Sequence, residues 1–247
     1  MRPVLFTFRG RPIHSYLVLL YLGLTAGVYA GVPAARDSGI APDRYAAVTL
    51  ILIAAALAGA HLLYVLTHRE RYRGRPQAVW SNRNGAAMYG GLIAAVAISP
   101  AALVPFAIPA GAYWDAAAVT MLVGMAFGRV GCLLTGCCCG RPSESWFAIR
   151  LPNLRGEWRR RVPMQPIESM LAAALAVAAM RARPYAPFRG AIFLAVLTIY
   201  GGCRAILQGY REEFNAGRDR RAARWISIVL ATAALLAIVA LWPRALR

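Results

Sequence analysis

Two arginines lie inside long apolar stretches of the sequence, Arg129 in a stretch that ends near Cys139 and Arg204 in a later one. A charged side chain is costly in such a place, so ionisable residues there are functional candidates by default. A guanidinium group keeps its charge and presents its N–H donors in a fork that fits a phosphate. If both groups lie at one end of a helical bundle, they can bind the phosphate of a phospholipid. The alternative is that each side chain only extends to the membrane interface.

Four of the five cysteines lie in one run, Cys132-x4-Cys137-Cys138-Cys139. Zinc sites usually take their ligands from separated pairs on loops, and this run lacks a second pair. The three histidines have no ligand spacing either. We therefore expect no metal and no cofactor, and interpret the cysteines as small buried apolar side chains. Reactive-thiol chemistry is the alternative, because residues 137–139 lie close to the expected end of a helix.

The composition is that of a membrane protein. The chain has 247 residues, of which 59% are hydrophobic and 15% charged, whereas soluble domains carry about 25% charged residues. Apolar blocks of about 20 residues match the hydrocarbon thickness of a bilayer. The N-terminal segment lacks the shape of a signal peptide, so we expect the first block to stay as a span. The net charge of +18 comes from arginines between the blocks, which favours anionic lipid over nucleic acid as partner.

We expect an all-α polytopic membrane protein with about seven transmembrane helices, forming a single domain over residues 1–247. A longer loop, residues 141–165, separates helices four and five. The expected spans are residues 15–34, 46–67, 86–106, 116–139, 166–180, 190–210 and 225–242.

Most polar residues of the expected spans lie near span ends. Because successive spans cross the membrane in opposite directions, these ends fall on one side. Spans one, three and five begin on the side where spans four and six end, which predicts a single polar pocket near that face. Glu168 is expected either to pair with an arginine or to accept a proton. The polar residues are His14, Tyr16, Tyr89, Arg129, Thr135, Gln165, Glu168, Tyr200, Arg204 and Gln208.

The connecting segments on that side are strongly basic: residues 69–83, 141–165 and 211–224. The positive-inside rule alone would place them in the cytoplasm.

Five motifs, in order and over nearly the whole chain, resemble those of the bacterial prolipoprotein diacylglyceryl transferases. The strongest is residues 128–140, similar to the family signature Gly-Arg-x-Gly-Asn-Phe-x-Asn-Gly-Glu-x-x-Gly. Residues 88–92 read Met-Tyr-Gly-Gly-Leu, where the family usually has Phe-His-Gly-Gly-Leu. The other three motifs are residues 13–16, 163–168 and 200–204.

The resemblance implies transfer of a diacylglyceryl group from phosphatidylglycerol to the lipobox cysteine of a preprolipoprotein, with release of glycerol phosphate. It implies a monomer in the bacterial inner membrane, with the motif face toward the periplasm, and we follow it over the charge count. The implied catalytic residues are Tyr89, Arg129 and Arg204. The implied substrate-binding residues are Tyr16, Gly90, Gly91, Cys132, Thr135, Cys137, Gly140, Gln165, Glu168, Tyr200 and Gln208.

The chain departs from the family pattern at three positions. Tyr89 replaces the usual histidine, Cys132 an asparagine and Cys137 a glutamate. A tyrosine hydroxyl is a poor general base compared with an imidazole. The alternative function is therefore that of an altered paralogue, which binds anionic phospholipid without transfer. A transporter is a third class, but the spans lack paired broken helices in two corresponding halves.

Overall fold

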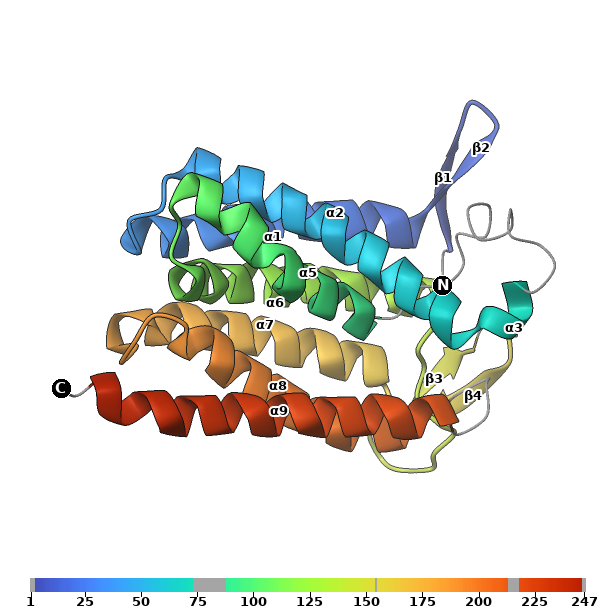
Figure 1. Ribbon diagram of the computed structural model, residues 1–247. Coiled ribbons are helices and arrows are strands. Elements are labelled where there is room, and N and C mark those ends of the chain that lie inside the picture. Colours follow the sequence, from blue (N-terminus) through green and yellow to red (C-terminus); the bar gives the residue numbers. More distant parts are fainter. Residues whose placement is uncertain (1–2, 73–87, 154, 213–217, 246–247) are drawn as a thin grey trace. The chain divides into compact units, whose positions relative to one another are not determined.

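The computed structural model describes residues 3–72, 88–153, 155–212 and 218–245 (Figure 1). Its helices follow the predicted apolar blocks, which confirms the all-α polytopic class. Short 3-10 turns extend three of them: η1 (Val104–Phe106), η2 (Arg183–Tyr185) and η3 (Gln208–Tyr210). The helices are α1 (Ser15–Asp37), α2 (Pro42–Thr67), α3 (Arg69–Tyr72), α5 (Met88–Leu103), α6 (Ala110–Thr135), α7 (Met164–Ala182), α8 (Ala191–Leu207) and α9 (Arg218–Ala245).

Six of the described helices are long and apolar enough to cross a membrane: α1, α2, α5 with η1, α6, α8 with η3, and α9. We expected about seven. Helix α7 has 19 residues and is not among the six; its first two turns carry the polar residues Gln165, Glu168 and Ser169. Arg73, Arg75 and Arg83, part of the first basic segment, lie outside the described residues.

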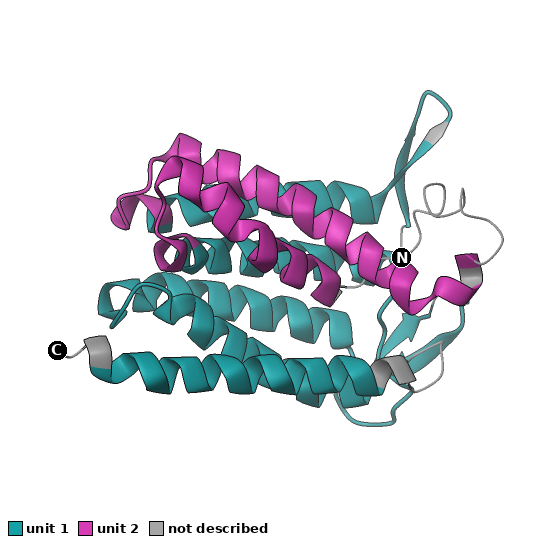
Figure 2. Ribbon diagram, viewed as in Figure 1, with its two compact units in different colours: residues 1–34, 114–247 teal, residues 35–113 magenta. Residues whose placement is uncertain are grey.

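The chain divides into two compact units, coloured separately in Figure 2. Unit 1 comprises residues 1–34 and 114–247, and unit 2 comprises residues 35–113.

In unit 2, α2 and α5 pack closely through small residues. A Cβ on Gly90 would lie 2.5 Å from the carbonyl oxygen of Gly59, and one on Gly91 would lie 3.0 Å from that of Ala56. Small residues at helix contacts let backbones approach in membranes. Gly90 and Gly91 therefore serve helix packing in unit 2.

In unit 1, α1 and α6 make a similarly close contact. A Cβ on Gly27 would lie 2.6 Å from the backbone oxygen of Thr120. The hydroxyl of Thr120 donates a hydrogen bond to the carbonyl oxygen of Gly27 at 2.8 Å, a contact that only a small residue permits.

An apolar core joins α6, α7 and α8, built from Val119, Leu122, Ala172, Ala176, Ala179 and Ile192. The carboxylate of Asp115, in α6, fixes the start of α8. It accepts hydrogen bonds from the backbone N–H of Gly190 at 2.6 Å and of Phe193 at 2.9 Å. A carboxylate there satisfies N–H groups that have no partner within the helix.

Two short antiparallel hairpins accompany the helices. Strands β1 (Val4–Phe8) and β2 (Arg11–His14) meet at a two-residue turn, where Arg9 and Gly10 both have positive φ. Such a turn matches the natural twist of a hairpin. Strands β3 (Ile149–Pro152) and β4 (Trp158–Arg161) lie in the long loop between α6 and α7, which confirms the expected longer connection.

Candidate functional site

Three arginines meet at the carboxylate of Glu168. The Nε of Arg129 lies 2.8 Å from one carboxylate oxygen, and Nη2 of Arg211 lies 2.7 Å from the same oxygen. Nη1 of Arg204 lies 3.7 Å from the other oxygen. Arg129 and Arg204 were expected to lie close together, and both contact this one group.

These four residues come from three helix ends and one loop, all in unit 1. Arg129 lies near the end of α6, Glu168 near the start of α7, and Arg204 in the last turn of α8. Because α7 runs opposite to α6 and α8, the three ends lie together (Figure 1).

Arg211 is held by backbone pairing between the segment after α6 and the segment after η3. The N–H of Arg141 donates to the carbonyl oxygen of Tyr210 at 2.8 Å, and the N–H of Glu212 donates to that of Cys139 at 3.0 Å. The Glu212 carboxylate also contacts the fully buried guanidinium of Arg161. This pairing sets the backbone from which Arg211 reaches Glu168.

The cluster carries more positive than negative charge. These four residues carry three guanidinium groups and one carboxylate, so their formal charges sum to +2, and Arg129, Arg204 and Glu168 are all at least nine-tenths buried. Buried charges are stable only when they are paired and hydrogen-bonded. The arrangement therefore favours binding of an anion.

Buried polar atoms surround this cluster. Within the described part of the chain, the Tyr200 hydroxyl, Nε of Arg211 and Oε1 of Gln165 make no hydrogen bond. Tyr200, in α8, is close enough to Arg129 for electrostatic interaction. Buried polar groups are normally satisfied by hydrogen bonds, so these atoms could contact a polar ligand.

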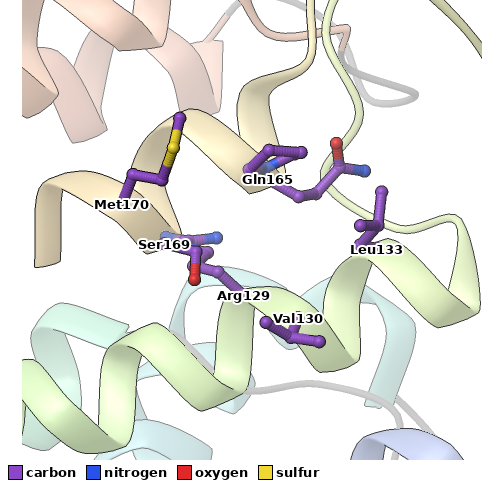
Figure 3. A pocket seen from close by; sticks show the side chains of 7 residues that line it. Arg129, Val130, Leu133, Gln165, Ser169 and Met170 are labelled. Carbon is purple, nitrogen blue, oxygen red and sulfur yellow. The ribbon is translucent and has the colours of Figure 1, made fainter. Parts of the chain in front are cut away.

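A pocket opens beside Arg129 between α6 and α7 (Figure 3). Apolar side chains form much of its wall, with Gln165 and Ser169 as polar members alongside the arginine. It is lined by Arg129, Val130, Leu133, Gln165, Pro166, Ser169 and Met170. A cationic group at an apolar wall suits an amphipathic anion.

The cysteines lie where α6 ends. Gly136, with φ of 73°, stops the helix. The N–H of Gly136 donates to the carbonyl oxygen of Leu133 at 3.3 Å, and the N–H of Cys137 donates to that of Cys132 at 3.1 Å. These two bonds define a Schellman motif, which folds the chain back over the last turn. The Sγ atoms of Cys132, Cys137 and Cys138 consequently lie within 4.8 Å of one another.

The thiols of Cys138 and Cys139, in the segment after α6, have pKa values shifted in opposite directions. Hydrogen bonds from Cys132 and Cys137, and then the nearby Arg211 and Arg129, lower the pKa of Cys138 well below the usual value for a thiol. Burial and a hydrogen bond to Glu212 raise the pKa of Cys139 to about 11. These shifts favour the thiolate form of Cys138 and the protonated form of Cys139.

The remaining predicted residues of unit 1 lie around the same helix ends. The Gln165 amide donates to the carbonyl oxygen of Cys137 at 2.8 Å, and the Thr135 hydroxyl donates to Sγ of Cys137 at 3.3 Å. Tyr16 packs against Gly131 of α6 and interacts electrostatically with the three grouped thiols. Gln208 is buried in η3.

Gly140 serves backbone packing, and the motif of α5 belongs to unit 2. Gly140 packs against Val162 with no room for a Cβ, so its role is close backbone approach. Tyr89 is buried in α5 and belongs, with Gly90 and Gly91, to unit 2.

Sequence reasoning did not single out Arg211. It lies seven residues after Arg204, a spacing that returns to the same helical face after two turns. In the sequence it marks the start of the basic connecting segment, residues 211–224. Its contact with Glu168 depends on the pairing of residues 139–141 with residues 210–212.

These features define a class, a multi-pass helical membrane protein with a buried cationic cluster where several helix ends meet. The profile of the prolipoprotein diacylglyceryl transferase family matches residues 3–240, and the chain belongs to this family.

Relatives named phosphatidylglycerol–prolipoprotein diacylglyceryl transferase have low sequence identity to the chain. The one from Clostridium tetani is 26% identical over 159 residues, which is 62% of this chain and 61% of the relative. The one from Streptococcus pyogenes serotype M5 is 25% identical over 237 residues, which is 92% of this chain and 90% of the relative. The chain thus spans about three fifths of the first relative and nine tenths of the second.

Proposed function

We propose that this protein transfers the diacylglyceryl group of phosphatidylglycerol to the lipobox cysteine thiol of bacterial preprolipoproteins. The product is a thioether, and glycerol phosphate leaves. The observation that carries the proposal is the convergence of three guanidinium groups, those of Arg129, Arg204 and Arg211, on the single carboxylate of Glu168. Membership of the family supports the reaction class.

The cluster suits both the lipid and the departing group. Guanidinium groups bind phosphate through paired N–H donors. As the bond between the glyceryl carbon and the phosphate oxygen breaks, negative charge grows on the leaving phosphate, and fixed cations stabilise it. The apolar wall formed by Val130, Leu133 and Met170 supports binding of an acyl chain beside the phosphate.

The second substrate is a preprolipoprotein signal peptide, whose thiol must become a thiolate before it attacks. Tyr89, in the position of the usual histidine, is a proposed catalytic residue, with its hydroxyl better suited to donating a hydrogen bond than to accepting a proton. We place the protein in the bacterial inner membrane as a monomer, with the cluster toward the periplasm, where it meets anionic lipid and exported precursors.

Mass spectrometry tests the proposal directly. The full-length protein in phosphatidylglycerol vesicles is incubated with a lipobox peptide, and with a matched peptide in which serine replaces the cysteine. The diacylglyceryl adduct is expected on the cysteine peptide alone, with an equal amount of glycerol phosphate. Absence of the adduct, under conditions in which the S. pyogenes relative forms it, would overturn the proposal.

The second candidate is a paralogue that binds anionic phospholipid without transfer. The observation that favours it is Tyr89, Cys132 and Cys137 at positions where the family usually has histidine, asparagine and glutamate. It predicts that phosphatidylglycerol binds more tightly than phosphatidylcholine while no glycerol phosphate is released. Any turnover above that of the Arg129→Ala variant would exclude it.

A further inference from the structure

Three thiols gather at the end of α6 without forming a disulfide. The Sγ atoms of Cys132, Cys137 and Cys138 lie within 4.8 Å of one another, and all three are free. Cys132 is buried, whereas the other two are partly exposed. The Schellman turn at Gly136, followed by positive φ at Cys138, brings this trio together. The backbone therefore sets the grouping, which the linear spacing does not reveal.

The dimensions of the trio suit a thiophilic metal ion. A zinc–thiolate bond is about 2.3 Å long, so two sulfurs on a tetrahedral zinc ion lie about 3.8 Å apart. The three Sγ atoms would need to approach by at most about 1 Å, which side-chain rotation supplies. Soft thiolate ligands select ions such as zinc over magnesium or calcium.

The surroundings suit a negatively charged metal–thiolate group. Arg129 and Arg211 both interact electrostatically with Cys138, and these arginines carry part of the excess positive charge around Glu168. The hydroxyl of Thr135 donates to Sγ of Cys137, and Gln165 holds the Cys137 carbonyl oxygen. Groups of this kind, just outside the ligands, orient a metal site.

Three protein ligands leave a fourth position open. Structural zinc sites are closed by four protein ligands, whereas catalytic sites use three and keep one position for water or substrate. In the described residues, the group contains three members and no fourth His, Asp, Glu or Cys. The pocket beside Arg129 lies next to the trio, because Gln165 both lines the pocket and bonds to Cys137.

We propose that Cys132, Cys137 and Cys138 bind one zinc ion, and that its open position takes the sulfur of the substrate lipobox cysteine. This inference rests on the proposed transfer reaction. The substrate thiol releases its proton to water on binding. Its sulfur then forms a bond to the glyceryl carbon of phosphatidylglycerol as the carbon–oxygen bond to phosphate breaks. The electron pair of the broken carbon–oxygen bond leaves with glycerol phosphate, which the arginine cluster binds. No group is oxidised or reduced.

Metal content is the first test, and it needs no turnover. The full-length protein is purified anaerobically in detergent, and its zinc is measured by mass spectrometry. About one zinc per chain is expected. Loss of a residue that only orients a metal ligand costs about 10–100-fold in metal affinity. Cys137→Ser and Cys138→Ser each remove a ligand itself, so their zinc affinity should fall by at least as much. Cys203→Ser, on α8, is the matched control and should keep its zinc.

Cobalt reports the ligands and the open position. The zinc-free protein loaded with Co²⁺ should have a sulfur-to-cobalt charge-transfer band, absent in Cys137→Ser and Cys138→Ser. Adding the cysteine lipobox peptide should change this band, whereas the serine peptide should not. This result would support the metal site even if no adduct forms. Absence of the adduct would then contradict only the proposed transfer reaction.

Three results would overturn the inference. One is a wild-type protein that takes up no zinc, or variants that bind it as well as the wild type. Another is a disulfide between two of the three cysteines in the anaerobic preparation. The third is undiminished adduct formation by zinc-free protein, which would leave the transfer reaction intact and remove the role of the metal.

Discussion

Arg211 donates from Nη2 to the carboxylate of Glu168 at 2.7 Å, although the two residues are 43 positions apart in the sequence. The same carboxylate oxygen lies 2.8 Å from Nε of Arg129. Glu168 thus joins the end of α6, the start of α7 and the segment after α8. Glu168 supplies one negative charge to three guanidinium groups. Its contacts therefore serve the packing of unit 1, while the cluster keeps its proposed affinity for anions.

Glu168→Gln should destabilise the protein. The change leaves three guanidinium groups without their shared carboxylate, and breaking a buried ion pair from one side costs about 3–5 kcal/mol. Thermal unfolding in neutral detergent should show a lower midpoint. Phosphatidylglycerol should raise this midpoint more in the variant than in the wild type, because the lipid phosphate replaces the lost charge.

Glu144→Gln is the control for this experiment, since Glu144 is exposed in the loop between α6 and α7. It should unfold like the wild type. Equal stabilisation of Glu168→Gln by phosphatidylglycerol and by phosphatidylcholine would show that the cluster does not bind the anionic head group.

Asp115→Ala should weaken the start of α8. The carboxylate accepts from the N–H groups of Gly190 and Phe193, and loss of such a cap costs about 1 kcal/mol. A lower unfolding midpoint is expected, with faster hydrogen exchange in the first turn of α8. Asp43→Ala, at an exposed position in the first turn of α2, should leave exchange in α8 unchanged; the same increase in both variants would argue against the cap.

Gly27→Ala and Gly202→Ala should have opposite effects. A Cβ at Gly27 meets the backbone oxygen of Thr120 at 2.6 Å, whereas one at Gly202 meets nothing within 4 Å. Overpacking the contact between α1 and α6 should cost about 1–3 kcal/mol, while alanine in an open helical position should add up to about 1 kcal/mol. Chemical denaturation in mixed micelles measures both, and an equal loss in the two variants would contradict the close contact.

The helices were predictable because each apolar block is long and bounded by polar residues. The boundary error that bears on the site is at the end of α6, which was expected near Cys139 but lies at Thr135. Gly136 was the available signal, since glycine adopts the left-handed conformation that stops a helix. The turn at Arg9 and Gly10 likewise forms a hairpin in a segment with no apolar periodicity.

Arg129, Arg204 and Glu168 were predicted from their cost inside apolar segments, which is a local property. Arg211 and the cysteine trio depend on where the backbone turns after a helix ends, and spacing rules do not include such turns. Gly90 and Gly91 were implied to bind substrate, but glycine pairs also allow close helix packing. Their contact with α2 supports the packing role.

We propose that the arginine cluster holds the phosphate during transfer. The most direct measurement of this role is glycerol phosphate release from phosphatidylglycerol, with a lipobox peptide as acceptor, by Arg129→Ala, Arg204→Ala and the control Arg181→Ala on the exposed end of α7. We expect a loss of at least about 100-fold for the first two variants and wild-type release for the control. Full release by Arg204→Ala, in folded protein, would contradict it.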